Sequence, residues 1–347
     1  MVRVYGNGAR VLLDYLQALG SGEETADLWA ALWADRAFMV WIEAYAPWLD
    51  DFEAHMRSLL RSPAVVPEAE PAAFWRAFSD GFLQAMEPET NARCRRALAA
   101  LMAADFGVAE RAALRYLPPG TPLDVEVYLT VDGANRGMFR DRRAFLSVLK
   151  VAPEEIPAVL GRFGHEFHHI GATYWFRRNP RLARMREGGP GKRMAVEIIE
   201  YLVAEGLANG FLSPQVLGPV EGASEAARVQ NERVGELEAR YPAGGIAQIE
   251  RLLLGAFSAS TPEELSALEQ AFEAFSIDLS GAGLPEGHFV AGRMVQRMAR
   301  SVPLERVVDL VRAPWRFFAC YNEAVGAGEP RFSERLLEGV ARFFSPA

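Results

Sequence analysis

The sequence predicts a predominantly helical α+β protein, and three patterns support that fold class. Through most of the first 110 residues, apolar side chains recur at helical spacing, as Val11, Leu12, Tyr15 and Leu16 do near the start. Near residue 125 the pattern changes to the alternation of a β-strand, and helical periodicity returns after it. We therefore expect a short β-sheet between helical N-terminal and C-terminal regions.

Composition limits the classes of function. The chain has 347 residues, of which 50% are hydrophobic and 24% charged, so it can bury a sizeable core in one large or two modest domains. Its net charge of −8 has the wrong sign for a general nucleic-acid-binding surface. Cys94 and Cys320 predict neither a disulfide framework nor a cysteine zinc cluster. We expect no nucleic-acid partner.

The sequence lacks two patterns that would indicate a membrane or secreted location. No run of 18 apolar residues is present, so no membrane span is expected. The first residues lack the charged and apolar regions of a secretory signal. The default expectation is a cytoplasmic protein.

The N-terminal region is expected to form a series of helices with short breaks. Thr25 and either Asp50 or Asp51 are candidate N-caps, and we interpret the four tryptophans before residue 50 as core residues rather than site residues. Prolines at 63, 67 and 71 mark a loop. The periodic segments are 9–19, 25–48, 51–60, 74–86 and 91–106.

A strand is predicted over residues 125–131, where every second residue is Val or Leu. Asp132 and Gly133 supply a turn signal, and 143–151 is a candidate second strand. Two interpretations remain open. The sheet is either a small structural hairpin or an edge that binds extended peptide through main-chain hydrogen bonds.

A metal-binding pattern lies in the next predicted helix, 153–176. His165, Glu166 and His169 form the motif His-Glu-x-x-His. Because residues i and i+4 lie on one face of a helix, the two imidazoles can bind one zinc ion. Glu166 flanks that position, where it can accept a proton from a zinc-bound water. The glycines on either side of the motif suggest that another segment approaches this helix closely.

A third ligand is expected on the following helix, 194–211, because catalytic zinc usually has three protein ligands. Glu205 is the best candidate, since its helical neighbours are largely apolar and a buried carboxylate needs a strong partner. Glu197 and Glu200 are alternatives. The small residues beside Glu205 predict close packing on the histidine helix.

The segments after the motif complete the chain. Residues 177–193 carry seven basic side chains and one acid, and their Pro and Gly residues predict a loop, either solvated or a cationic lid that attracts acidic substrates. Thr261 begins a well-capped helix, and 280–283 is a flexible break. Further helices are predicted at 229–237, 246–257, 265–275, 287–300, 303–311, 315–325 and 332–344.

The chain resembles the gluzincin clan of zinc peptidases, whose familiar member is thermolysin, and resembles more closely some bacterial families of zinc-dependent peptidases. The resemblance rests on residues 165–169, His-Glu-Phe-His-His, and 205–208, Glu-Gly-Leu-Ala, within a core of roughly 120–215. It implies a zincin-like core with zinc at His165, His169 and Glu205, and Glu166 as general base.

The same resemblance implies supporting roles. Asn209 occupies the position of an acidic residue that orients the ligands in thermolysin-like enzymes. Gluzincins take a donor for the developing oxyanion from a downstream Tyr or His, which makes His288 and Tyr321 candidates. His168 lies about 100° around the helix from His169, so it is expected to support or pack rather than to bind.

These observations predict a zinc-dependent hydrolase, a metallopeptidase acting on peptides or small peptide-like substrates. Its expected regions are helical 1–115, a catalytic core 116–215 and helical 216–347, which completes the cleft. The alternative is a non-catalytic helical binding protein with a structural zinc site. No pattern assigns an oligomeric state.

Overall fold

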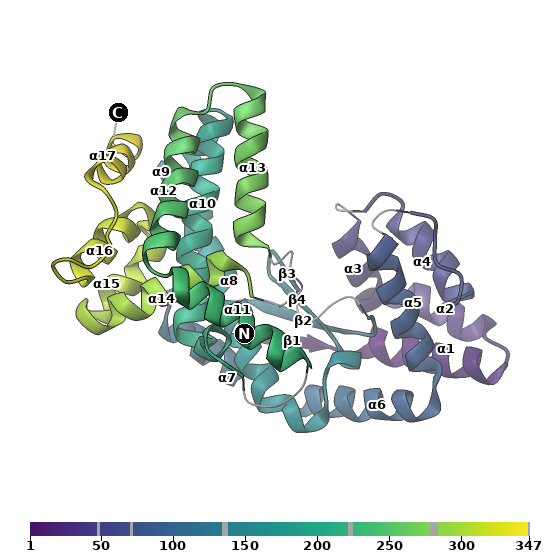
Figure 1. The fold of residues 1–347 in the computed structure, drawn as a ribbon. Coiled ribbons are helices and arrows are strands. Elements are labelled where there is room, and N and C mark those ends of the chain that lie inside the picture. Colours follow the sequence, from purple (N-terminus) through teal and green to yellow (C-terminus); the bar gives the residue numbers. More distant parts are fainter. Residues whose placement is uncertain (47–48, 70–71, 134–137, 221–224, 278–283, 346–347) are drawn as a thin grey trace. The chain divides into compact units, whose positions relative to one another are not determined.

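The computed structural model describes residues 1–347 except 47–48, 70–71, 134–137, 221–224, 278–283 and 346–347 (Figure 1). The chain divides into two compact units. Unit 1 comprises Met1–Glu110 and Leu123–Phe167, and unit 2 comprises Arg111–Pro122 and His168–Ala347. The boundary falls inside one continuous helix, α8 (Ile156–Arg178). The described residues are mostly helical with a small mixed sheet, which confirms the predicted fold class.

Unit 1 begins with a strand and a series of helices, most of them predicted from apolar periodicity. Gly22, with φ of 71°, ends the first helix in the left-handed conformation that glycine adopts at little cost. The helix predicted over 91–106 begins earlier, at Pro88, and ends at Ala103, and the Asn91 amide inside it donates to the carbonyls of Leu13 and Ala85. The helices are α1 (Asn7–Ser21), α2 (Ala26–Ala34), α3 (Arg36–Tyr45), α4 (Phe52–Arg61), α5 (Ala72–Met86), α6 (Pro88–Ala103) and α7 (Gly107–Arg115), the last of which crosses into unit 2.

An aromatic cluster forms the core of these helices. Trp41 and Trp75 are almost fully buried, and Trp41 stacks on Phe78 with ring centroids 5.8 Å apart. Trp33 is half-buried, and the guanidinium of Arg57 lies 3.6 Å from its ring centroid. Trp41 is therefore a core residue, as predicted, whereas Trp29 and Trp33 are half-buried at the edge of the cluster. Trp48 lies outside the described residues.

The sheet has the strand order β1-β2-β4-β3 among the described residues. Its strands are β1 (Val2–Tyr5), β2 (Val125–Thr130), β3 (Met138–Arg140) and β4 (Arg143–Ser147). β2 pairs in parallel with both β1 and β4, and β3 pairs antiparallel with β4. β1 was not predicted, and the predicted strand 143–151 ends at Ser147, where a 3₁₀ turn follows. Because β2 and β4 are parallel, they form no hairpin with each other.

Unit 2 contains the second half of α8 and the remaining helices. The loop predicted for 177–193 is wrong, because α9 occupies Pro180–Glu187 and α10 already begins at Pro190. Asn179 caps α9 by accepting from the N–H groups of Arg181 and Leu182, and each proline stands at a first helical position, where it favours helix initiation. The helices are α9, α10 (Pro190–Leu207), α11 (Glu225–Arg240), α12 (Ala243–Ser258), α13 (Pro262–Ser276), α14 (Glu286–Ser301), α15 (Leu304–Val308), α16 (Phe317–Ala324) and α17 (Glu334–Phe343).

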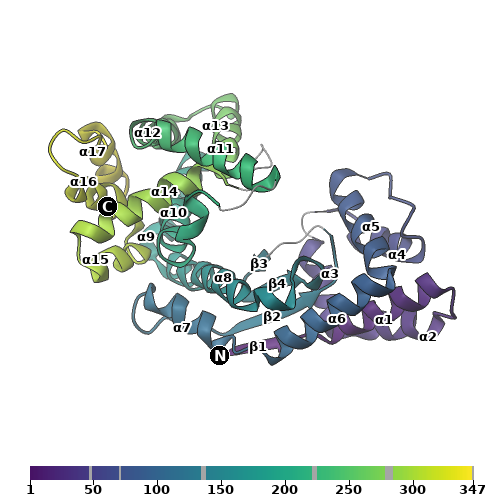
Figure 2. The same cartoon turned by 60° about the horizontal axis from the view of Figure 1, so that its bottom comes forward.

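Helix α10 is central to unit 2, where it packs against α9, α12 and α14 (Figure 2). The small residues near Glu205 were expected to allow close packing on the histidine helix. Gly206 and Gly210 pack closely on another helix, α14: a Cβ on Gly206 would lie 3.0 Å from the Val295 side chain, and one on Gly210 would lie 2.9 Å from it. A π-helical turn (Ala208–Leu212) ends α10. The helix start predicted at Thr261 is confirmed, and the structure adds a capping box between Thr261 and Glu264. The expected break at 280–283 lies outside the described residues.

Among the described helices, none combines the length and apolar character that a membrane crossing requires.

Candidate metal centre

Three potential metal ligands come together from two helices. His165 and His169 lie one turn apart on α8, and Glu205 lies in the last turn of α10. Their ligand atoms all lie within 4.8 Å of one another, and His169 Nε2 is 3.3 Å from Glu205 Oε1. The structure thus brings together two residues that helical periodicity pairs and a third that is distant in sequence.

Burial sets the protonation of this group. It lowers the pKa of His169 to about 4, so at neutral pH the imidazole is uncharged and keeps a lone pair for a metal. It also raises the pKa of Glu205, while His288 and the hydrogen bond from Asn209 act in the opposite direction. A carboxylate held in such surroundings is stabilised most effectively by a cation.

Two further side chains contact Glu205. The Asn209 amide donates to Glu205 Oε2 at 2.9 Å and to the Glu205 carbonyl at 3.0 Å. His288, in the first turn of α14, places Nε2 3.5 Å from the same Oε2. One carboxylate oxygen therefore contacts the amide and His288, and the other lies beside His169.

This donor set fits a zinc ion. Zinc binds imidazole nitrogen at about 2.0–2.1 Å and carboxylate oxygen at about 2.0–2.2 Å, so a tetrahedral ion separates its ligand atoms by roughly 3.3–3.5 Å. The three donor atoms lie within 4.8 Å of one another, so small changes in side-chain rotamers bring them to that spacing. Two nitrogens and one carboxylate oxygen also match the His₂Glu set that leaves one position open.

A comparison with family models matches residues 97–327 to the family described as "putative zinc dependent peptidase (DUF5700)". The chain belongs to this family. The matched segment includes all three clustered residues together with Asn209 and His288. Comparisons with curated proteins and with solved structures find no match.

Tyr201, inside the segment matched to the zinc-peptidase family, is a neighbour of the cluster that the sequence analysis did not assign to the site. It lies one turn before Glu205 on α10, and its ring centroid is 5.8 Å from that of His288. A Cβ added to Gly287 would lie only 2.5 Å from the Tyr201 hydroxyl. Burial, with a contribution from Glu205, raises the pKa of Tyr201, so the hydroxyl keeps its proton. The spacing from Glu205 was the available signal, because i and i+4 share a helical face.

Tyr321, also within the family segment, lies in a different environment. It is almost fully buried, it shares a hydrogen bond with Tyr241, and its ring packs edge-on against Phe332 at 5.6 Å. These contacts are between side chains of the helical core.

His168 is fully buried beside the motif. Its Nε2 donates to the carbonyl of Tyr116 at 3.1 Å, and burial lowers its pKa to about 3. The Tyr116 ring stacks on Phe211, with centroids 4.4 Å apart, in the π-helical turn that follows α10. His168 therefore links α8 to a segment that contacts the end of the Glu205 helix.

The alternative glutamates of α10 point elsewhere. Glu197 is exposed, and Glu200 accepts a hydrogen bond from the guanidinium of Arg186. The Glu200 side chain is only 19% exposed, and Arg186 supplies its partner in place of a metal. Arg186 comes from the basic segment 177–193, for which the sequence left open a solvated loop or a cationic lid. Arg181 of that segment packs over Trp315 at 5.1 Å. These two arginines have structural partners in unit 2.

Proposed function

We propose that the chain is a zinc metallopeptidase in which His165, His169 and Glu205 hold the ion. The observation that carries this proposal is the convergence of two imidazoles, of which His169 is kept neutral by burial, and one largely buried carboxylate, with donor atoms within 4.8 Å of one another. Membership of a family described as zinc-dependent peptidases supports peptide as the substrate class.

Zinc in such a site supplies Lewis acidity, which acidifies a water and polarises a carbonyl. The residues of the chain supply the proton transfers. Glu166 directly follows His165 on α8, and its carboxylate accepts a proton from the attacking water. The resulting carboxylic acid then donates that proton to the nitrogen of the departing amine, so that Glu166 ends in its initial state.

A donor for the developing oxyanion is also required, and we assign it to the pair His288 and Tyr201. His288 lies 3.5 Å from a Glu205 oxygen, and Tyr201 lies beside it with a protonated hydroxyl, whose hydrogen bond to the Ser276 carbonyl is long at 3.4 Å. The core contacts of Tyr321 give less support for the same role. His288 belongs to the helical region 216–347, which supports the idea that this region completes a core of 116–215.

The open coordination position favours catalysis over the alternative of a structural zinc site. Structural zinc is almost always held by four protein ligands, whereas this cluster offers three among the described residues. His168, next to His169 in the sequence, directs Nε2 to the Tyr116 carbonyl instead. His288 contacts Glu205 at 3.5 Å but does not belong to the group of three whose ligand atoms all lie within 4.8 Å of one another.

The test is a Glu166→Gln variant, with Glu187→Gln, an exposed glutamate on α9, as the matched control. Because Glu166 acts as a base rather than a ligand, the variant should keep about one zinc per chain while its turnover falls by at least about a hundredfold. Elemental analysis gives the zinc content, and a fluorogenic peptide pool gives the turnover. A zinc-loaded Glu166→Gln protein with wild-type turnover would refute the assigned mechanism.

A further inference from the structure

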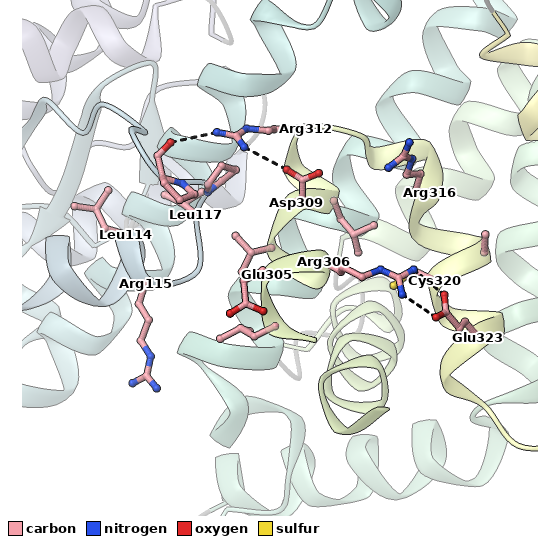
Figure 3. A pocket seen from close by; sticks show the side chains of 16 residues that line it. Leu114, Arg115, Leu117, Glu305, Arg306, Asp309, Arg312, Arg316, Cys320 and Glu323 are labelled. Carbon is pink, nitrogen blue, oxygen red and sulfur yellow. Dashed lines mark hydrogen bonds and ion pairs between the residues drawn. The ribbon is translucent and has the colours of Figure 1, made fainter. Parts of the chain in front are cut away.

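Unit 2 contains a second site that the proposed chemistry does not use. It is a pocket of about 930 Å³ between the segment 114–119 and the segment 304–323. Figure 3 shows Arg115 and Leu117 on one side, Arg316 and Cys320 on the other, and Glu305 between them. No clustered metal ligand lines it, and its volume is near the upper end of small-molecule sites, about 300–1,000 Å³.

The charged side chains of this pocket fall into two groups. In the first, Arg306 makes two hydrogen bonds to Glu323, at 2.8 and 2.7 Å, and Arg312 donates to Asp309 and to the Pro119 carbonyl (Figure 3). The second group is Arg115, Arg316 and Glu305. Within the part of the chain that the structure describes, their side chains make no hydrogen bond or ion pair, and Arg115 only lies over the Tyr116 ring at 5.5 Å. Two cationic groups, on opposite sides of the pocket, and one anionic group therefore remain available to a ligand.

The rest of the lining is mainly apolar. Leu117, Val308 and Leu310 are buried side chains that present methyl groups to the pocket, and Leu304 is half-buried beside them. A ligand that fills this space needs an aliphatic portion, because burial of apolar surface provides most of the binding free energy in such sites.

We propose that this pocket binds the C-terminal end of a peptide with an aliphatic last residue. The terminal carboxylate pairs with Arg316, since a guanidinium presents two parallel N–H donors to a carboxylate. The aliphatic side chain packs against Leu304, Val308 and Leu310. Glu305 accepts a hydrogen bond from a backbone N–H or an ammonium group of the same peptide.

Charge complementarity favours a peptide over a fatty acid. A simple anionic amphiphile would pair with Arg316 but has no donor for the carboxylate of Glu305, the one acid of the lining that is not paired with an arginine. A peptide carries N–H donors along its length and can satisfy both signs of charge. This inference does not rest on the proposed zinc chemistry, because no residue of the pocket belongs to the metal cluster.

The experiment is calorimetric titration of the full chain carrying Glu166→Gln. If the chain is a peptidase, this substitution prevents cleavage of the probe during the titration. If it is not, the substitution does not affect the measurement, because Glu166 does not line the pocket. The probes are the tetrapeptide Ala-Ala-Leu-Leu as the free acid, the same peptide as its C-terminal amide, and octanoate. The acid should bind about tenfold more tightly than the amide, because a charge-assisted pair is lost in the amide. Octanoate should bind more weakly than the acid.

Two variants and one control locate the site. Arg316→Gln should lower the affinity for the acid about tenfold and abolish the difference between acid and amide. Ala319→Trp, at an exposed position on the pocket wall, should block binding without creating a buried defect. Arg300→Gln, an exposed arginine of α14 that does not line the pocket, should leave binding unchanged. Equal affinities for acid and amide in the parent, octanoate binding as tight as the acid, or full acid binding by the Ala319→Trp variant would each overturn the proposal.

Discussion

Helix α10 carries two largely buried glutamates, Glu200 and Glu205, whose neighbouring side chains differ in kind. Burial raises the pKa of both carboxyl groups. Around Glu200 the compensation comes from a guanidinium, that of Arg186, which hydrogen-bonds the carboxylate and also lowers its pKa. Around Glu205 the neighbouring groups are His169, His288 and the Asn209 amide.

The Glu200 carboxylate already has a cationic partner within the protein, whereas the Glu205 carboxylate lies in a group of potential metal ligands. An arginine keeps its proton under all ordinary conditions, so the Glu200 pair needs nothing further. Buried imidazoles are neutral at pH 7 and do not supply a positive charge, so the Glu205 region gains most from an added cation. The following predictions test that contrast in order of decreasing effect.

The largest effect should come from replacing the two glutamates in turn. Glu205→Ala should weaken zinc binding by more than about a hundredfold, since loss of residues that merely support a ligand already costs about 10–100-fold. Glu200→Ala should change zinc affinity little, because its partner is Arg186. Competition with a chromophoric chelator measures both affinities. Similar losses in the two variants would remove the distinction between the two regions.

Replacing Tyr201 tests whether the region around Glu205 includes an oxyanion donor. Tyr201→Phe should lower kcat about a hundredfold, as loss of one such donor typically does, and should leave the zinc content unchanged. Tyr321→Phe is the matched control, since its hydroxyl shares a hydrogen bond with Tyr241. A larger fall in kcat for the control would reassign the donor to Tyr321.

A smaller effect is expected for Asn209, which holds one oxygen of Glu205. Asn209→Ala should weaken zinc binding about tenfold, because the carboxylate loses its orienting hydrogen bond. Asn209→Asp tests the acidic residue that thermolysin-like enzymes have at this position. If the alanine variant binds zinc as tightly as the parent, the hydrogen bond from the amide does not orient the ligand.

The smallest effect concerns acid stability of the metal-free chain. The folded-state pKa of His168 is about 3 and its unfolded value about 6.5, so the unfolded chain binds more protons below pH 6.5. Stability is therefore fully present above about pH 6.5 and is lost as the pH falls, by about 2 kcal/mol from this residue at pH 5. Urea unfolding with chelator at pH 7 and pH 5 should show a smaller loss for His168→Gln than for the parent. His55→Gln in unit 1 is the control, and an unchanged loss in the His168 variant would contradict the expectation.

Local patterns allowed much of the fold to be predicted. Apolar periodicity located most helices, and Thr261 with Pro262 and Glu264 marked the start of α13, because capping depends on neighbouring residues. The strand β1 was missed because its four residues pair with β2, more than 100 residues later, and carry little signal of their own. A loop was wrongly predicted for residues 177–193 because proline is common both after the end of a helix and at its first position. Here Asn179 caps the N-terminus of α9, so Pro180 begins a helix.

For the candidate site, the sequence by itself determined the spacing of His165 and His169, because 3.6 residues per turn place i and i+4 together in any α-helix. It also suggested Glu205, through the cost of a carboxylate among apolar neighbours. Only the tertiary structure decided which face of α10 meets the histidines, and only the packing of α14 on α10 brought His288 to Glu205 and Gly287 against Tyr201. Such contacts join segments far apart in the chain, and the close packing of side chains between helices, rather than any local periodicity, selects them.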